Sequence, residues 1–274
     1  MKIRHVILTR FNLRYQESTK NLSIEWLEER IQLFQTYTLP SIQAQTNQDF
    51  EWFILIDVHT PESICQCLQD IADSYKVIRL VPVEAQGDEA LNAYYRSLAN
   101  ELGKGYDLLI STRLDSDDCL TSDFMSTTYN LSDTNPTPVA ISFPNGLQYF
   151  SQKKWTFRIT YPCNHFLTLC EKGDSARSAL GYDHTRIHDY VPLKLEYTSQ
   201  PMWTEIVHGG NIANTYTPAL KPHPQSFTWN NIIGFIALHL HYRGWQLQYA
   251  IRHPKKAIDH IFSLSTSAKH TEQE

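Results

Sequence analysis

The chain has 274 residues, of which 42% are hydrophobic and 12% are aromatic. So many apolar side chains can fill a buried core, which excludes an intrinsically disordered or fibrous protein. The formal net charge of −5 offers no basic excess, so we expect no nucleic-acid partner.

We expect no targeting signal and no membrane span in this sequence. Only a short apolar run, residues 6–8, separates Arg4 from Arg10, and this is too short for the core of a signal peptide. The longest apolar stretch, residues 232–240, is about half of a membrane span, so we expect no transmembrane segment and leave peripheral membrane association open. Five cysteines, an odd number, predict reduced thiols and a cytoplasmic protein.

The first half of the chain alternates strand-like and helix-like segments. Strands are expected at 3–9, 52–56, 77–83 and 108–110. Helices are expected after Ser23, after Thr60-Pro61 and over 91–102, with Pro40 breaking or kinking the first of them. Strands separated by such helices predict an α/β fold with a mostly parallel, Rossmann-like sheet.

The second half shows a different pattern. Residues 139–143 and 147–150 suggest a hairpin around Asn145-Gly146, and 155–161 alternates like another strand. The polar stretch 171–189 is expected to form a loop or short helices, 232–242 a buried helix, and the residues from 263 onward a frayed tail.

An acidic cluster directly after the fourth strand is the sharpest chemical signal. Asp115, Asp117 and Asp118 would repel one another in a dry crevice, and a divalent cation would resolve that conflict. Alternation in an extended segment would point Asp115 and Asp117 to the same side. The carboxyl ends of parallel strands form the ligand crevice of such sheets, so Thr9-Arg10 and Asp57 should lie at the same edge. The alternative is a solvated acidic turn before the helix that starts near Thr121.

Several ordered motifs give the chain a family resemblance. They are Leu8-Thr9-Arg10-Phe11-Asn12, Tyr37-Thr38-Leu39-Pro40-Ser41 with Gln45, Asp49-Phe50-Glu51-Trp52, Thr112-Arg113-Leu114-Asp115-Ser116-Asp117-Asp118, and the segment from Trp203 to Asn211. With these motifs in this order, the chain resembles GT-A glycosyltransferases. It resembles more closely the bacterial rhamnosyltransferase group within that fold. The resemblance implies one GT-A-like domain over 1–274. Its parts would be a nucleotide-sugar half (1–120), an acceptor-side α+β half (121–262) and a flexible tail (263–274).

The resemblance also implies a reaction. It is a metal-assisted, inverting transfer of a sugar from a nucleotide-diphosphate donor to a glycan or lipid-linked acceptor. Mn²⁺ or Mg²⁺ held by Asp115 and Asp117 would neutralise the leaving diphosphate. Thr9, Arg10 and Arg113 would belong to the donor site, the two arginines binding phosphate, with salt bridges to neighbouring aspartates as the alternative. The donor sugar stays open, although the name of the group points to rhamnose.

Two further roles follow for polar residues of the crevice. Asp57 is expected to accept a hydrogen bond from the nucleobase, the alternative being a turn residue before Thr60. His208, followed by two glycines, is expected to complete the metal site, because imidazole suits Mn²⁺. His184 and His188 are the other candidates for this metal ligand, and the alternative role for His208 is a hydrogen bond within the core.

Inversion needs a carboxylate that takes the acceptor proton. Glu205 is the first choice, because its distance from the nucleotide motif is similar to that of the base in related transferases. Asp189 and Asp183 are the other candidates.

Two other functions remain open. A nucleotidyltransferase would normally carry a glycine-rich basic loop near its start, and residues 9–15 contain no glycine. A non-catalytic nucleotide-sugar binding module is the second alternative, which only a turnover measurement can exclude.

Overall fold

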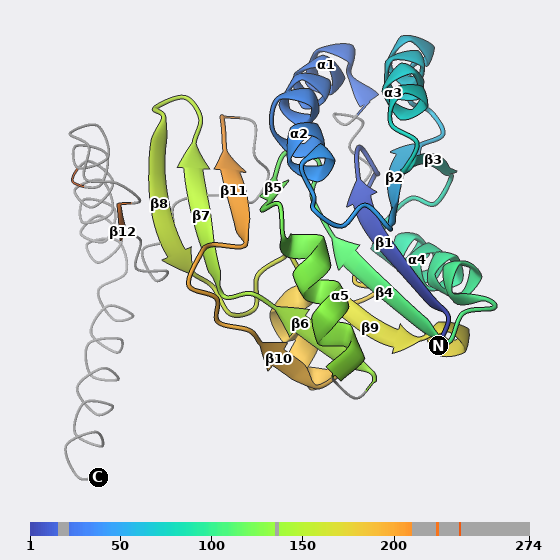
Figure 1. Ribbon diagram of the computed structural model, residues 1–274. Helices are drawn as coiled ribbons and strands as arrows, with labels where there is room; N and C mark the ends of the chain where they lie inside the picture. Colours follow the sequence, from blue (N-terminus) through green and yellow to red (C-terminus); the bar gives the residue numbers. More distant parts are fainter. Residues whose placement is uncertain (16–21, 135–136, 210–222, 225–235, 237–274) are drawn as a thin grey trace, which may run out of the picture.

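The structure is a computed structural model that describes residues 1–15, 22–134, 137–209, 223–224 and 236. Its strands form two sheets, one of seven strands and one of five, which lie side by side in Figure 1. Helices pack on the larger sheet, and the strand β4 points its carboxyl end toward the smaller sheet (Figure 1).

The larger sheet has the strand order β10-β6-β9-β4-β1-β2-β3. Its strands are β1 (Ile3–Arg10), β2 (Glu51–Asp57), β3 (Ile78–Val83), β4 (Leu108–Arg113), β6 (Val139–Ser142), β9 (Thr168–Lys172) and β10 (Leu193–Leu195). β1 pairs in parallel with β2 and β4, and β2 pairs in parallel with β3. β9 runs antiparallel to β4 and β6, while β10 is parallel to β6. The predicted α/β class with a mostly parallel sheet is therefore confirmed.

Helices cover both faces of this sheet. They are α1 (Ile24–Leu33), α2 (Leu39–Gln43), α3 (Glu62–Ser74), α4 (Asp88–Gly103) and α5 (Phe124–Thr134). β1 shows the alternation: Ile7 packs with residues of α1, α2, α3 and α5, whereas Val6 and Leu8 pack with α4. The predicted stripe from Leu91 to Leu102 on α4 is buried against the second of these faces.

The first predicted helix is continuous rather than broken at Pro40. Ser23 caps it, since its Oγ accepts a hydrogen bond from the Trp26 N–H at 3.4 Å. A π-helical turn, Phe34–Thr38, joins α1 to α2, and Pro40 stands in the first turn of α2. Proline is tolerated at a helix start because few intrahelical donors are needed there. The chain therefore accommodates Pro40 through the π-helical turn that precedes it, and the helix continues to Gln43.

The smaller sheet has the order β12-β8-β7-β11-β5. Its strands are β5 (Cys119–Leu120), β7 (Asn145–Phe150), β8 (Trp155–Thr160), β11 (Trp203–Val207) and β12 (His223–Pro224). β11 lies between β7, its parallel neighbour, and β5, its antiparallel neighbour. β5 follows the acidic cluster directly, so this sheet begins where the larger sheet ends.

The predicted hairpin around Asn145-Gly146 is wrong. β6 belongs to the larger sheet and β7 to the smaller one, where β7 pairs with β8. The indole of Trp203 occupies the place where a side chain at position 146 would begin, and the Trp203 Nε1–H donates to the Phe143 carbonyl at 2.7 Å. Gly146 is therefore needed for close packing and not for a tight turn.

The polar stretch 171–189 also holds more structure than expected. Its first two residues end β9, and the 3-10 helices η3 (Gly173–Ser175) and η4 (His184–Asp189) follow. The expected helix at 232–242, Asn211 of the last motif and the tail from 263 lie outside the described residues. Among the helices that the structure describes, none is both long enough and apolar enough to cross a lipid bilayer.

Candidate active site

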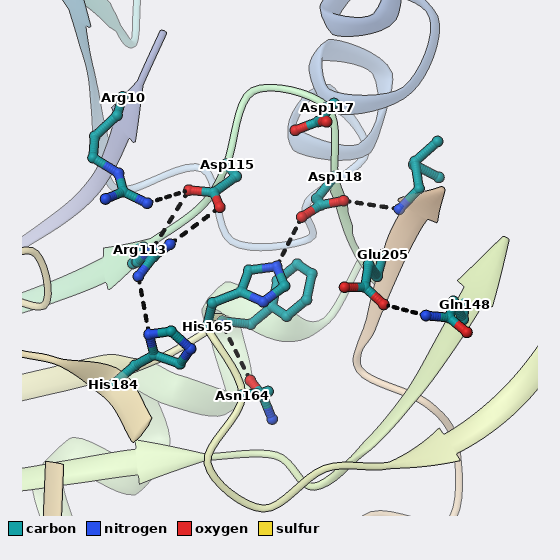
Figure 2. Close-up of polar contacts among 12 residues, drawn as sticks. Arg10, Arg113, Asp115, Asp117, Asp118, Gln148, Asn164, His165, His184 and Glu205 are labelled. Carbon is teal, nitrogen blue, oxygen red and sulfur yellow. Dashed lines mark hydrogen bonds and ion pairs between the residues drawn. The ribbon is translucent and has the colours of Figure 1, made fainter. Parts of the chain in front are cut away.

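The acidic cluster lies at the carboxyl edge of the parallel strands, between the two sheets (Figures 1 and 2). The segment is a turn and not an extended run, because the Asp118 N–H donates to the Asp115 carbonyl at 3.3 Å. A turn sends successive side chains in different directions. Asp115, Asp117 and Asp118 consequently contact three different sets of partners, and the expected same-side alternation is not observed.

Asp115 lies between the two predicted arginines. Its carboxylate contacts Arg10 at 3.1 Å and Arg113 at 3.2 Å. Burial alone would raise the pKa of Asp115, but the Arg113 and Arg10 guanidiniums outweigh it and hold that pKa well below its usual range. Arg113 also lies 3.2 Å from Nδ1 of His184, so Arg113 stands between Asp115 and His184 (Figure 2). Both expected phosphate ligands therefore lie at the edge of the acidic turn, where they form the salt bridges to an aspartate that were expected as the alternative.

Asp118 is completely buried and links distant parts of the chain. One oxygen accepts a hydrogen bond from the Ile206 N–H of β11 at 2.8 Å, and the other lies 2.8 Å from His165 Nε2. Burial, with Asp117 and Asp115 close by, raises the pKa of Asp118 well above its usual range. Burial lowers the pKa of His165, so a neutral imidazole donating its Nε2–H to Asp118 fits this pair.

Asp117 faces the helix α1 and the residue after β11. Its Oδ2 lies 2.8 Å from Arg30 Nη1 and 2.9 Å from His208 Nε2. The side chains of Asp117 and His208 are 8% and 6% exposed, so this contact is buried. The structure therefore brings together two of the three residues that we expected to share a metal ion, whereas the third, Asp115, pairs with Arg10 and Arg113.

Glu205, the first candidate for the base, points into the same region from β11. In Figure 2 its carboxylate lies between Asp118 and Gln148, and it accepts a hydrogen bond from the Gln148 amide at 2.8 Å. Burial is the main factor that raises the pKa of Glu205, and the nearby Asp118 acts in the same direction. A carboxyl whose pKa is raised in this way holds its proton more tightly than a free one, which suits a group that takes a proton in general base catalysis.

The other two candidates for the general base contact residues that are close to them in the sequence. Asp189 is 40% exposed and pairs with Arg186 at 2.9 Å and His188 at 3.4 Å, all on η4. Asp183 accepts a hydrogen bond from the Thr185 N–H at 3.0 Å and so caps the same short helix. Neither carboxylate contacts the acidic turn among the contacts of the described residues.

Asp57 is fully buried at the end of β2 and already has partners on both oxygens. Oδ2 lies 2.6 Å from Arg14 Nε, and Oδ1 accepts from the His59 N–H at 2.8 Å. Although burial pushes the pKa of Asp57 upward, the bonds from Arg14 and His59 lower it overall. Thr9 lies beneath the site rather than facing it, because it is buried and its Oγ1 accepts from Trp52 Nε1 at 2.8 Å.

The donor set suits a hard divalent cation. Ligand atoms of Asp115, Asp118 and His165 all lie within 4.8 Å of one another. The second grouping is Asp117 with His208, whose contacting atoms are 2.9 Å apart. Neighbouring ligands of an octahedral Mg²⁺, each roughly 2.1 Å from the ion, lie about 3 Å apart, so both of these atoms could bind one ion. Carboxylate ligands suit both Mg²⁺ and Mn²⁺, and the softer imidazole nitrogen favours Mn²⁺ over Mg²⁺.

Sequence reasoning missed several residues of this region. They are Arg14, Arg30, His59, Gln148 and His165. A signal for one of them was present: His165 stands just before an apolar run that forms an antiparallel strand. Such a strand begins at the edge where its parallel neighbours end, and Thr168 of β9 is paired with Thr112 of β4.

Comparison with solved structures gives distant matches. The S. aureus TarS 1–349 structure in complex with UDP is 14% identical, with 76% of this chain and 61% of that chain covered and a TM-score of 0.43. The same TarS fragment in complex with UDP-GlcNAc is 14% identical, with 79% and 62% covered and a TM-score of 0.44. A glucose-1-phosphate thymidylyltransferase from Bacillus anthracis, described as putative, is 11% identical, with 73% and 88% covered and a TM-score of 0.37. This chain thus spans about three fifths of the TarS 1–349 chains.

Comparison of the sequence with protein families gives a match over most of the chain. No curated protein matches the sequence. The family described as "Putative rhamnosyl transferase" matches residues 9–220, which include the acidic turn, Glu205 and His208. The match covers most of the chain, and the chain therefore belongs to this rhamnosyl transferase family.

Proposed function

We propose that the protein transfers a sugar from a nucleotide-diphosphate donor to an acceptor hydroxyl, with Mn²⁺ or Mg²⁺ bound at the acidic turn. One observation carries the proposal: a single turn at the carboxyl edge of the sheet has two arginines on one side and the half-buried carboxyl of Glu205 on the other. Such an edge combines groups for a diphosphate with a group for a proton. Membership of a glycosyltransferase family supports the same reaction class.

Arg10 and Arg113 are the proposed diphosphate ligands. Both guanidiniums contact Asp115 in this structure, and a diphosphate oxygen could replace that carboxylate in part of each contact. Charge-assisted bonds from arginine are well suited to phosphate, because the guanidinium offers several donors in a fixed plane. Asp57, with Arg14 and His59, forms the proposed nucleobase end of the same edge.

Asp117 and His208 are the proposed protein ligands of the ion, with Asp115 beside them. Their contacting atoms are hydrogen-bonded at 2.9 Å, close enough for both to turn to one ion, and they come from the turn and from the residue after β11. Asp118 and His165 are proposed to act as a brace, since both oxygens of Asp118 are already hydrogen-bonded and fully buried. When bound, the ion would stabilise the negative charge that develops on the departing diphosphate.

Glu205 is the proposed general base of an inverting transfer. The acceptor hydroxyl gives its proton to the Glu205 carboxylate while its oxygen bonds to the anomeric carbon. The bond from that carbon to the diphosphate oxygen breaks with its electron pair, and the nucleoside diphosphate leaves. Burial favours the protonated form of Glu205, which makes the carboxylate a stronger base.

A binding and turnover experiment tests the proposal. Calorimetry with UDP, dTDP, GDP, CDP and ADP, each with and without Mn²⁺, should show one nucleoside diphosphate whose affinity rises with the metal. A matching nucleotide sugar should then release that diphosphate in the presence of an acceptor. Release of pyrophosphate from a nucleoside triphosphate and a sugar phosphate would favour a nucleotidyltransferase, and binding without any turnover would favour a binding module.

Paired variants decide which residues hold the ion. Asp117→Asn should weaken Mn²⁺ binding strongly, while Asp118→Asn should leave it nearly unchanged. The opposite result would assign the ion to Asp115, Asp118 and His165, whose ligand atoms also converge.

A further inference from the structure

A buried arginine lies against the carboxylate that we assign to the metal. Arg30 is only 7% exposed, and its Nη1 is 2.8 Å from Asp117 Oδ2. It comes from α1, where Leu27 and Ile31 on the same helix are buried in the core. Arg30 is therefore held on the inner side of the helix, where a charged side chain is costly unless it is paired.

Arg30 and His208 contact the same oxygen of Asp117. His208 Nε2 lies 2.9 Å from Oδ2, and Arg30 Nη1 lies 2.8 Å from it. A divalent ion bound to Asp117 would therefore come close to the positive charge of Arg30 as long as Arg30 keeps this contact. Like charges at such a separation repel far more strongly in a buried site than in water.

We propose that Arg30 is an internal competitor of the metal ion, occupying Asp117 in the metal-free protein and leaving Oδ2 when the ion binds. The inference rests on the metal site of the proposed function. In the metal-free protein the guanidinium neutralises the carboxylate of Asp117, so that neither charge is buried without a partner. The same contact lowers the affinity for the ion alone, so tight binding requires the diphosphate to arrive with it and add its own negative charge.

Trp26 supplies a means of following the exchange. The guanidinium of Arg30 lies over the Trp26 ring, 4.7 Å from its centre, and Trp26 packs against the core. A cation over an indole face interacts with the π electrons of the ring. Movement of Arg30 away from Asp117 should therefore change the fluorescence of Trp26.

The first experiment measures Mn²⁺ affinity by electron paramagnetic resonance on the purified full chain. Arg30→Gln should bind Mn²⁺ more tightly than the wild type by about tenfold or more, because a repelling charge has been removed. Arg4→Gln is the matched control: Arg4 pairs with Glu51 at 2.7 Å near the amino end of the sheet, and its loss should not change Mn²⁺ affinity. An equal or weaker Mn²⁺ affinity in Arg30→Gln would overturn the proposal and make Arg30 a purely structural partner.

The second experiment uses the unaltered arginine, so it does not depend on the folding of Arg30→Gln. Titration of the wild type with Mg²⁺, in the presence of the nucleoside diphosphate that calorimetry identifies, should change tryptophan emission, and the change should vanish in Trp26→Phe. An identical response in both proteins would overturn the exchange. No change in the wild type under these conditions would also overturn the exchange. Failure of the proposed function is distinguishable, since it would show as no release of nucleoside diphosphate from any nucleotide sugar, whatever the Mn²⁺ affinities of the wild type and Arg30→Gln. Metal-assisted nucleotide binding with no effect of Arg30→Gln would leave the proposed function standing and remove only Arg30's role.

Discussion

The carboxylate of Asp118 accepts a hydrogen bond from the backbone N–H of Ile206 at 2.8 Å, which fixes the acidic turn to β11. Ile206 directly follows Glu205, so this bond sets the position of the candidate base relative to Asp115 and Asp117. The bond thereby links the larger sheet to the smaller sheet where the proposed chemistry requires the aspartates and Glu205 to keep a fixed relative position.

Asp118→Ala should destabilise the protein. The substitution leaves the Ile206 N–H and the His165 ring without their buried acceptor, and an unsatisfied buried donor costs roughly 1–3 kcal/mol. We expect urea unfolding to show a loss of about 2–4 kcal/mol for the two contacts together. Asp118→Asn keeps one acceptor oxygen and should lose less. An Asp118→Ala variant as stable as the wild type would contradict the brace.

Glu205→Gln should lower turnover while leaving nucleotide affinity unchanged. Glutamine keeps the size of the side chain and an oxygen for the Gln148 amide but cannot take a proton. We expect the catalytic rate to fall by about 10²- to 10⁴-fold. Asp189→Asn is the matched control, because Asp189 is exposed and paired on η4, and its turnover should stay within about twofold of the wild type. If the two variants exchanged these results, the base would be Asp189.

Asp57 should contribute to stability above about pH 4 and lose that contribution in acid. Its pKa is lowered in the folded protein, so between the folded and unfolded pKa values the unfolded chain binds more protons. Stability supplied by Asp57 is therefore lost as the pH falls through the folded pKa. Chemical denaturation from pH 6 to pH 3 should show a shallower acid loss in Asp57→Asn than in the wild type. Parallel curves would show that the ion pair with Arg14 adds nothing measurable.

His5 should make the protein sensitive to mild acid. Both of its ring nitrogens are buried without a hydrogen-bond partner, and burial lowers the pKa of His5 to about 3. The unfolded chain binds this proton near pH 6.5, so stability present above that pH falls by up to about 1.4 kcal/mol per pH unit below it. His5→Leu should flatten the loss between pH 6.5 and 4, as measured by urea midpoints. A wild-type slope in that variant would assign the sensitivity to other groups.

Local sequence determined which segments form the parallel strands and their helices, and in what order these follow one another along the chain. The apolar run 52–56 and the stripe from Leu91 to Leu102 specify their elements through the spacing of neighbouring residues, which is independent of the rest of the chain. The placement of Arg10 and Asp115 at one edge also followed from the sequence, because all parallel strands of a sheet end on the same side.

Only the tertiary structure decided how the three aspartates are used. They lie within four positions of one another, yet Asp115 pairs with Arg10, Asp117 with Arg30 and Asp118 with His165, each partner coming from a different element or loop. The same limit produced the wrong hairpin, since Gly146 is required by the ring of Trp203 on another strand. Contacts between residues far apart in the chain leave no periodic signal in either segment, so they are fixed only when the two sheets pack together.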